Sequence, residues 1–200
     1  MVNDWLKSDI MQRSFGLRKM FVNAKPYKHL VIENFLDEWK ARQLLGALKK
    51  EKFEEKDSDL FQFRQTGELK FSKNKVISEF NELMRIKISE LIEEISGLKL
   101  KRKIDMAGSL YIDTDYLLCH DDKLEKRKIA YVYYLCDFKE EDGAAFVLFK
   151  DKNGRPWKAA RKYLPKWNSL LIFEVTKKSW HEVEEVIGKK KRYAIGGWFY

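Results

Sequence analysis

The pattern of apolar positions divides the chain into an earlier helical part and a later part of short strands. Apolar residues recur every three or four positions from about Lys75 to Ser96, which predicts a helix, and Gly97 stands where it would stop. An earlier helix is predicted from a cap at Asp37 through about Lys50. Its expected apolar stripe is Trp39, Leu44, Leu45 and Leu48.

After residue 97 the pattern changes to short runs rich in Val, Ile, Tyr and Phe, separated by turn residues. The predicted strands are 104–112, 129–136, 145–149 and 170–175. The run 129–136 is apolar on both faces, which is typical of a strand covered on both sides. Residues 151–156 have the composition of a turn or exposed loop. The second half is therefore interpreted as a compact antiparallel barrel or jelly roll.

The domain organisation is expected to be simple. The chain has 200 residues with 44% hydrophobic content, enough to bury one substantial core, and it shows no internal repeat. We expect a single domain over residues 1–200, with a helical buttress over about 1–97 and a β core over about 98–200.

The ends and the cysteines bear on location. The first residues carry charges where a secretory signal needs an apolar run, and no stretch approaches the roughly 18 apolar residues of a membrane span. Cys119 and Cys136 lie in apolar runs, which favours buried reduced thiols over a secreted disulfide framework. A cytoplasmic protein without a membrane partner is expected, and a nuclear location is left open.

The net charge is +9, from 40 Lys and Arg against 31 Asp and Glu. The densest basic groups lie at 49–50, 99–103, 123–128 and 189–192. Such groups could touch phosphates, but a solvated surface is the preferred interpretation. Charge alone therefore identifies no partner.

Candidate chemistry lies in His120-Asp121-Asp122 and in a second histidine, His181. In an extended segment residues i and i+2 project to the same side, so His120 and Asp122 can address one point while Asp121 faces away. With His181 they would form the two-histidine, one-carboxylate facial triad of non-haem Fe(II) oxygenases. By the same alternation, Cys119 should point away from the metal.

Each of these histidines has a plainer interpretation. His120 alone would be a weak ligand candidate, and the residues after His181 begin like a zinc-protease helix motif. That motif lacks its second histidine four positions on, so zinc hydrolysis is disfavoured. His29 has no carboxylate at useful spacing and is interpreted as structural.

Arg192 lies eleven residues after His181, on what should be the next strand of a small barrel. By itself it would be interpreted as a surface charge. A guanidinium inside a barrel can form a bidentate pair with a carboxylate, and an oxygenase that uses 2-oxoglutarate needs such a group for the distal carboxylate of that co-substrate.

Several segments of the chain, taken together, resemble the prolyl hydroxylases of the ribosomal-protein-modifying Tpa1/Ofd1 type over roughly residues 20–200. The segments that carry the resemblance are 116–122 with His120-Asp121-Asp122, 127–135, Glu141-Asp142-Gly143-Ala144, 173–175, Ser179-Trp180-His181-Glu182-Val183, and upstream 26–36 and 59–69. The combination is far more specific than the triad alone.

The resemblance implies an α+β, mainly β fold, a double-stranded β-helix of the jelly-roll, cupin-like kind buttressed by N-terminal helices. It implies Fe(II) held by His120, Asp122 and His181, with 2-oxoglutarate and dioxygen as co-substrates and ascorbate as a candidate reductant. Arg192 would bind the distal carboxylate, with Tyr111 and Tyr134 as hydrogen-bonding partners.

It also implies a protein substrate, a proline in a small-subunit ribosomal protein. Basic loops at 123–128 and 150–162 would form a rim that contacts rRNA. The alternatives left open are another protein, a free amino acid or a nucleic-acid base as substrate, and a non-catalytic barrel that binds ribosome or RNA. The oligomeric state is also left open.

Two positions depart from the family pattern. A usual glycine pair is Gly143-Ala144 here, and the position two after Arg192, often serine, is Ala194. Neither change removes a metal ligand, but a missing hydroxyl would weaken co-substrate binding. The eukaryotic members also carry a second, degenerate barrel that is absent from these 200 residues, so its functions are not carried over.

Overall fold

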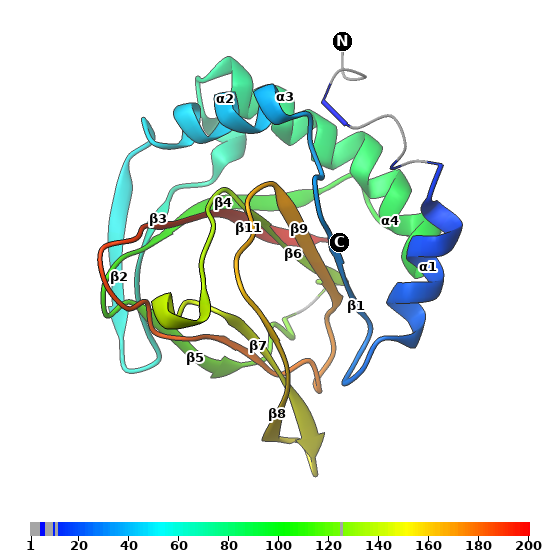
Figure 1. The fold of residues 1–200 in the computed structure, drawn as a ribbon. Helices are drawn as coiled ribbons and strands as arrows, with labels where there is room; N and C mark the ends of the chain where they lie inside the picture. Colours follow the sequence, from blue (N-terminus) through cyan, green and yellow to red (C-terminus); the bar gives the residue numbers. More distant parts are fainter. Residues whose placement is uncertain (1–4, 7–9, 11, 125) are drawn as a thin grey trace.

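The computed structural model describes residues 5, 6, 10, 12–124 and 126–200 (Figure 1). The helices are α1 (Ser14–Asn23), α2 (Glu38–Leu48), α3 (Lys75–Leu83) and α4 (Ser89–Ser96). The strands are β1 (His29–Ile32), β2 (Phe53–Ser58), β3 (Phe61–Thr66), β4 (Ile104–Tyr111), β5 (Tyr116–His120), β6 (Ile129–Tyr134), β7 (Phe146–Lys152), β8 (Arg155–Tyr163), β9 (Ser169–Glu174), β10 (His181–Val183) and β11 (Arg192–Phe199).

The strands form one curled antiparallel sheet in the order β1-β9-β6-β11-β4-β3-β5-β10-β7-β8, with β2 added on β3. Figure 1 shows β5 and β7 facing β4, β11, β6 and β9 across the barrel, and α2, α3 and α4 covering the outside of the second group. β3 joins the two walls because it pairs with both β4 and β5. The predicted double-stranded β-helix with a helical buttress is confirmed.

Strand alternation separates two apolar cores. On β6, Ile129, Tyr131 and Tyr133 pack in the core shared with the helices, whereas Ala130 and Tyr134 pack inside the barrel. Successive side chains of a strand point to opposite faces, so a strand apolar on both faces serves both cores. The doubly covered strand predicted at 129–136 is therefore confirmed, and the barrel interior is left for the site.

The predicted helices begin and end at the expected signals. The Asp37 carboxylate accepts hydrogen bonds from the backbone N–H groups of Trp39 and Lys40, and Gly97 ends α4 with φ at 74°. The predicted helix 75–96 is observed as α3 and α4 joined by a π-helical turn at Met84–Ile88. In the described part of the chain, no helix is long and apolar enough to cross a membrane.

One assignment within α2 is wrong. Trp39 was expected in the buried stripe but is 62% exposed, and the buried residues are Ala41, Leu44, Ala47 and Leu48. At 3.6 residues per turn, Trp39 lies about 140° around the helix from Leu44, so both cannot face the same core. The small residues Ala41 and Ala47 take its place against the sheet.

The prediction described about the first 97 residues as a helical buttress, but they are not only helical. They also contain α1 and the strands β1, β2 and β3, all of which pair into the sheet. The sequence pattern missed β2 and β3 because their side chains are largely polar and only partly buried, so backbone pairing holds them in place. β1 was missed because it has only four residues.

Candidate active site

His120 and His181 are brought together by strand register. His120 ends β5, His181 begins β10, and the two are directly opposite in the antiparallel pair. Paired residues on neighbouring strands share a face, so both imidazoles project into the barrel. Asp122, two residues beyond His120, turns to the same point: its carboxylate oxygens lie 3.4 Å from His181 Nε2 and 3.7 Å from His120 Nε2.

The backbone fixes the tautomer of both imidazoles. Nδ1 of His120 lies 2.9 Å from the Leu118 carbonyl oxygen, and Nδ1 of His181 lies 2.8 Å from that of Ser179. A carbonyl oxygen only accepts, so each Nδ1 carries the proton and donates it. Each Nε2 therefore directs a free lone pair towards Asp122, as a metal ligand must.

His181 is also held in its neutral form. Its ring is stacked on Phe146 at 5.0 Å between centroids and lies 4.7 Å from the ring of Phe173. This burial lowers the pKa of His181 to about 4, although Asp122 opposes the shift. The imidazole is therefore unprotonated near neutral pH, and no proton has to leave before a metal binds.

These three side chains fit Fe(II). Their ligand atoms all lie within 4.8 Å of one another, and two neutral imidazoles with one carboxylate form the facial set of non-haem iron oxygenases. Asp121 is engaged elsewhere, because its carboxylate accepts a hydrogen bond from the Lys123 backbone N–H. Neither cysteine is among the described residues that line the cavity next to these side chains. This agrees with the expected orientation of Cys119.

A cavity of about 720 Å³ runs from these ligands into the barrel and reaches Arg192. Arg192 is 2% exposed, its Nε donates to the Ala144 carbonyl oxygen at 3.2 Å, and its Nη2 has no hydrogen-bond partner. No carboxylate of the described residues lies within 4 Å of this guanidinium. A buried cation without a counter-ion is costly, so the site calls for an anion.

Two phenols lie beside this guanidinium, and of the two Tyr111 lines the cavity. The guanidinium carbon of Arg192 lies 4.9 Å from the ring centroid of Tyr111 and 5.1 Å from that of Tyr134. Burial raises the pKa of Tyr134 to about 12 and also raises the pKa of Tyr111, although Arg192 opposes both shifts. Both phenols therefore keep their protons, and the buried, unpartnered hydroxyl of Tyr134 can donate to a carboxylate. This arrangement fits the distal carboxylate of 2-oxoglutarate.

The departure at Ala144 has a structural consequence. Ala144 has φ at 62°, in the left-handed region that glycine adopts without strain. Its carbonyl oxygen is the acceptor for Arg192 Nε. The second departure, Ala194, is fully buried and directly opposite Tyr134 in the β11–β6 pair. Both departures thus lie within the wall that holds Arg192.

Sequence reasoning missed Arg127 and Trp198, which also line the cavity. The guanidinium carbon of Arg127 lies 3.4 Å from the Trp198 ring centroid, and its Nη1 lies 3.9 Å from Asp122 Oδ1. Trp198 follows Arg192 by six positions on one strand, and this even spacing was a usable signal for the same face. Arg127 lies outside the strands, where no periodicity exists.

His29 lies outside the metal cluster, as expected. Its Nδ1 donates to the Tyr27 carbonyl oxygen at 2.7 Å, and its Nε2 lies 2.7 Å from the Tyr163 hydroxyl. Both ring nitrogens are therefore used within the fold, which supports the structural interpretation.

Residues 106–200 match the family model described as the 2OG-Fe(II) oxygenase superfamily. The matched segment contains all three ligand candidates and Arg192. The chain contains a 2OG-Fe(II) oxygenase domain. This family uses Fe(II), 2-oxoglutarate and dioxygen, in agreement with the donor set of the site.

Two curated relatives carry prolyl hydroxylase names. The Mus musculus protein named Prolyl 3-hydroxylase OGFOD1 is 36% identical over 193 residues, which are 93% of this chain and 35% of that protein. The Xenopus laevis protein of the same name is 34% identical over 186 residues, 90% of this chain and 36% of that protein. The oxygenase chain thus spans about a third of the length of these relatives.

A solved structure shares the fold of the oxygenase domain. A Trichoplax adhaerens prolyl hydroxylase, in complex with a hypoxia inducible factor oxygen degradation domain peptide fragment, superimposes with a TM-score of 0.75. The match covers 97% of this chain and 93% of that chain at 18% sequence identity. At this identity the likeness supports the double-stranded β-helix and nothing more.

His120→Ala and His181→Ala are each expected to lower iron-dependent 2-oxoglutarate turnover by more than about 100-fold. Losing only the hydrogen-bonding partner of a metal ligand costs about 10- to 100-fold, and losing the ligand itself should cost more. Succinate formation and Fe(II) binding by calorimetry measure the effect, and circular dichroism checks the fold. Asp121→Ala is the matched control and should remain close to wild type. An equal loss in the control would show that the ligand is the neighbouring aspartate.

Arg192→Lys is expected to weaken 2-oxoglutarate binding by about 2 to 5 kcal/mol, because a point charge replaces a fork in a buried carboxylate site. Calorimetry with the co-substrate measures this loss, and Fe(II) binding should change far less. Lys191→Gln, at the exposed adjacent position, is the control. An unchanged affinity and Michaelis constant for 2-oxoglutarate in Arg192→Lys would place the anion site elsewhere.

Ala144→Gly is expected to raise the free energy of unfolding by up to about 1 kcal/mol, because relief of left-handed strain exceeds the added backbone entropy of glycine. Urea unfolding measures the change. Ala145→Gly, at a buried neighbour with ordinary φ, should instead destabilise the fold. Equal destabilisation by both changes would refute the strain at Ala144.

Proposed function

We propose that this protein is a 2-oxoglutarate- and Fe(II)-dependent prolyl hydroxylase that acts on a proline within a protein. The observation that carries the proposal is the arrangement of one cavity. A complete Fe(II) ligand set lies along it, and deeper in the barrel lies a buried arginine that has no counter-ion among the described residues. The prolyl hydroxylase names of the relatives support the choice of substrate residue.

Each side chain has a defined task in this reaction. His120, Asp122 and His181 would hold the metal. Arg192, with Tyr111 and Tyr134, would hold the distal carboxylate of 2-oxoglutarate. Bound together, Fe(II) and 2-oxoglutarate supply the chemistry that places one oxygen atom of dioxygen in a substrate C–H bond and the other in succinate, with release of carbon dioxide. Phe146 and Phe173 pack against His181 and keep water from that side of the ligands.

The cavity mouth favours a polypeptide over free proline. Leu60, at the β2–β3 turn, and Leu118, on β5, both line the cavity and are 58% and 46% exposed. Their backbones are joined, since the Leu118 N–H donates to the Leu60 carbonyl oxygen at 2.8 Å. Exposed apolar side chains beside a site are typical of protein contacts, and a zwitterionic amino acid would not need them.

A small-subunit ribosomal protein is the proposed substrate, and ascorbate the proposed reductant. The resemblance to the Tpa1/Ofd1 type supports the substrate, and the basic segments 123–128 and 150–162 are consistent with contact to the surrounding rRNA. A cytoplasmic location, with the nucleus left open, remains a prediction. The assembled or partly assembled subunit would then be a better substrate than the isolated basic protein, which a basic surface repels.

Mass spectrometry is expected to detect a gain of one oxygen on a proline in small ribosomal subunits incubated with the enzyme, Fe(II) and 2-oxoglutarate. The same assay should compare free proline and proline-containing ribosomal peptides. Leu118→Asp should lower hydroxylation of protein while turnover of 2-oxoglutarate alone persists, because Leu118 is expected to contact only the substrate. A preference for free proline would overturn the protein substrate, and oxidation of a nucleobase would replace it.

A further inference from the structure

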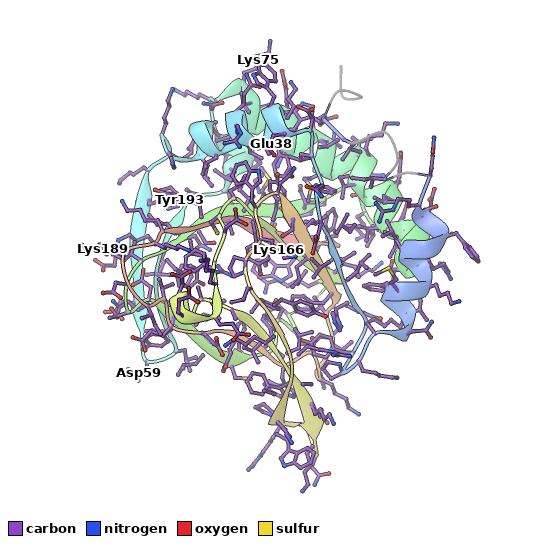
Figure 2. All side chains as sticks on the ribbon, viewed as in Figure 1. Glu38, Asp59, Lys75, Lys166, Lys189 and Tyr193 are labelled. Atoms are coloured by element: carbon purple, nitrogen blue, oxygen red, sulfur yellow. The ribbon has the colours of Figure 1, made fainter. Side chains whose placement is uncertain are left out.

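The hairpin formed by β7 and β8 projects from the barrel, at the bottom of the view in Figure 1. Its two-residue turn is Asn153-Gly154, with φ at 56° and 77°, as required for a tight hairpin. β8 is the last strand of the sheet order, so no strand of the described residues pairs with its outer edge. The expected exposed loop at 151–156 is therefore the tip of a regular arm, whose side chains extend away from the body in Figure 2.

The arm carries a dense positive charge. Residues 150–162 include one carboxylate, Asp151, and six exposed cations, which are Lys150, Lys152, Arg155, Lys158, Arg161 and Lys162. Lys162 pairs with Glu184 at 2.7 Å, and in the described part of the chain the other five have no carboxylate within 4 Å. Asp151 accepts hydrogen bonds from Trp180 Nε1 at 3.1 Å and from the Gly154 N–H at 3.3 Å. The only carboxylate of the arm is thus already engaged.

The register places like charges opposite each other. Lys150 is the partner of Lys158, and Lys152 is the partner of Arg155. Directly paired residues share a face, and like charges at such positions destabilise the strand pair. Lys150 and Lys152 also share a face, because they are two residues apart on one strand. Four cations therefore gather on one face, an arrangement that a bound polyanion would relieve.

Trp157 adds a second feature to the arm. It is 59% exposed, it lies where the β7–β8 register shifts between Lys158 and Pro156, and Lys152 Nζ lies 5.1 Å from its ring centroid. Lysine and proline on an edge strand are ordinary protection against aggregation. That role does not explain an exposed tryptophan, because a large apolar side chain favours aggregation at a strand edge. A ring among cations is instead the combination on which single-stranded nucleic acids bind.

We propose that the β7–β8 arm binds single-stranded nucleic acid, with phosphates at the cation face and a base stacked on Trp157. No residue of the arm from 150 to 162 lines the described active-site cavity, so this inference does not rest on the proposed hydroxylation. An acidic polypeptide would pair with the same cations but would gain little from Trp157. The tryptophan therefore distinguishes the two classes of partner.

Binding is tested with the full chain and a short fluorescein-labelled RNA of mixed sequence, by anisotropy at several salt concentrations. The arm variant is Lys150→Gln, Arg155→Gln and Lys158→Gln combined. Its matched control, Lys19→Gln, Lys50→Gln and Lys73→Gln, removes the same charge from exposed positions of the helical layer. Lys75, two residues beyond the last of these, lies at the opposite end of the molecule from the arm in Figure 2.

The arm variant is expected to bind RNA on the order of tenfold more weakly, and its salt slope should fall by about 2, since each lost phosphate contact contributes roughly 0.7 on single strands. The control should bind like wild type. Equal weakening of both variants would overturn the proposal, because binding would then follow total charge. Circular dichroism and RNA-free 2-oxoglutarate turnover, both unchanged, show that fold and catalysis are retained.

Trp157→Ala should weaken RNA binding about fivefold or more, the effect of losing one stacked base. Labelled poly-glutamate is the competing probe. If it binds the arm as tightly as RNA and Trp157→Ala changes neither, the arm serves an acidic protein and the nucleic-acid proposal is wrong.

Discussion

The site depends first on the pairing of His120 with His181 between β5 and β10. A slip of one residue in either strand would turn one imidazole to the opposite face of the sheet and leave no ligand set. The carbonyl oxygen two residues earlier, that of Leu118 or Ser179, lies beside each Nδ1 and fixes the tautomer that a metal needs. The position of both imidazoles thus follows from one backbone pairing, whereas burial against Phe146 and Phe173 keeps His181 neutral.

The second constraint is electrostatic. Arg192 places a full positive charge inside the barrel, and neighbouring phenols keep their protons and offer only donors to an anion. This arrangement costs stability until a carboxylate arrives, so an anionic co-substrate should stabilise the fold as well as react in it. The chain adds local strain at Ala144 to hold Arg192, although glycine would avoid it. The unpaired charge of Arg192 and the strain at Ala144 therefore both lower the stability of the barrel when no anion is bound.

The sequence predicted those parts of the structure that local chemistry specifies. The Asp37 cap, the stop at Gly97 and the i, i+2 pair of His120 and Asp122 are all readable within a few residues. Pairing partners are not local, so the joining strand β3 and the contact of Arg127 with Asp122 could not be derived. The assignment of Trp39 was wrong for a different reason, because its angular position on α2 places it away from the face that buries Ala41, Leu44, Ala47 and Leu48.

β7 shows how the binding partner of the arm can change while the residues of the candidate active site stay the same. Its inner half, from Phe146 to Leu148, is buried and pairs with β10 beside His181, whereas its outer half alternates towards solvent and carries Lys150 and Lys152. Substitutions on the outer half remove no packing from the metal ligands, and effects at separated sites add with little coupling. Two hydrogen bonds join β7 to Trp180, the residue before His181: the indole Nε1 of Trp180 donates to Asp151 at 3.1 Å, and the Phe149 N–H donates to the Trp180 carbonyl oxygen at 3.0 Å. The exposed cations of the arm can therefore vary without touching the candidate ligands, whereas loss of Asp151 would leave the backbone bond from Phe149 as the remaining one of these two contacts to Trp180.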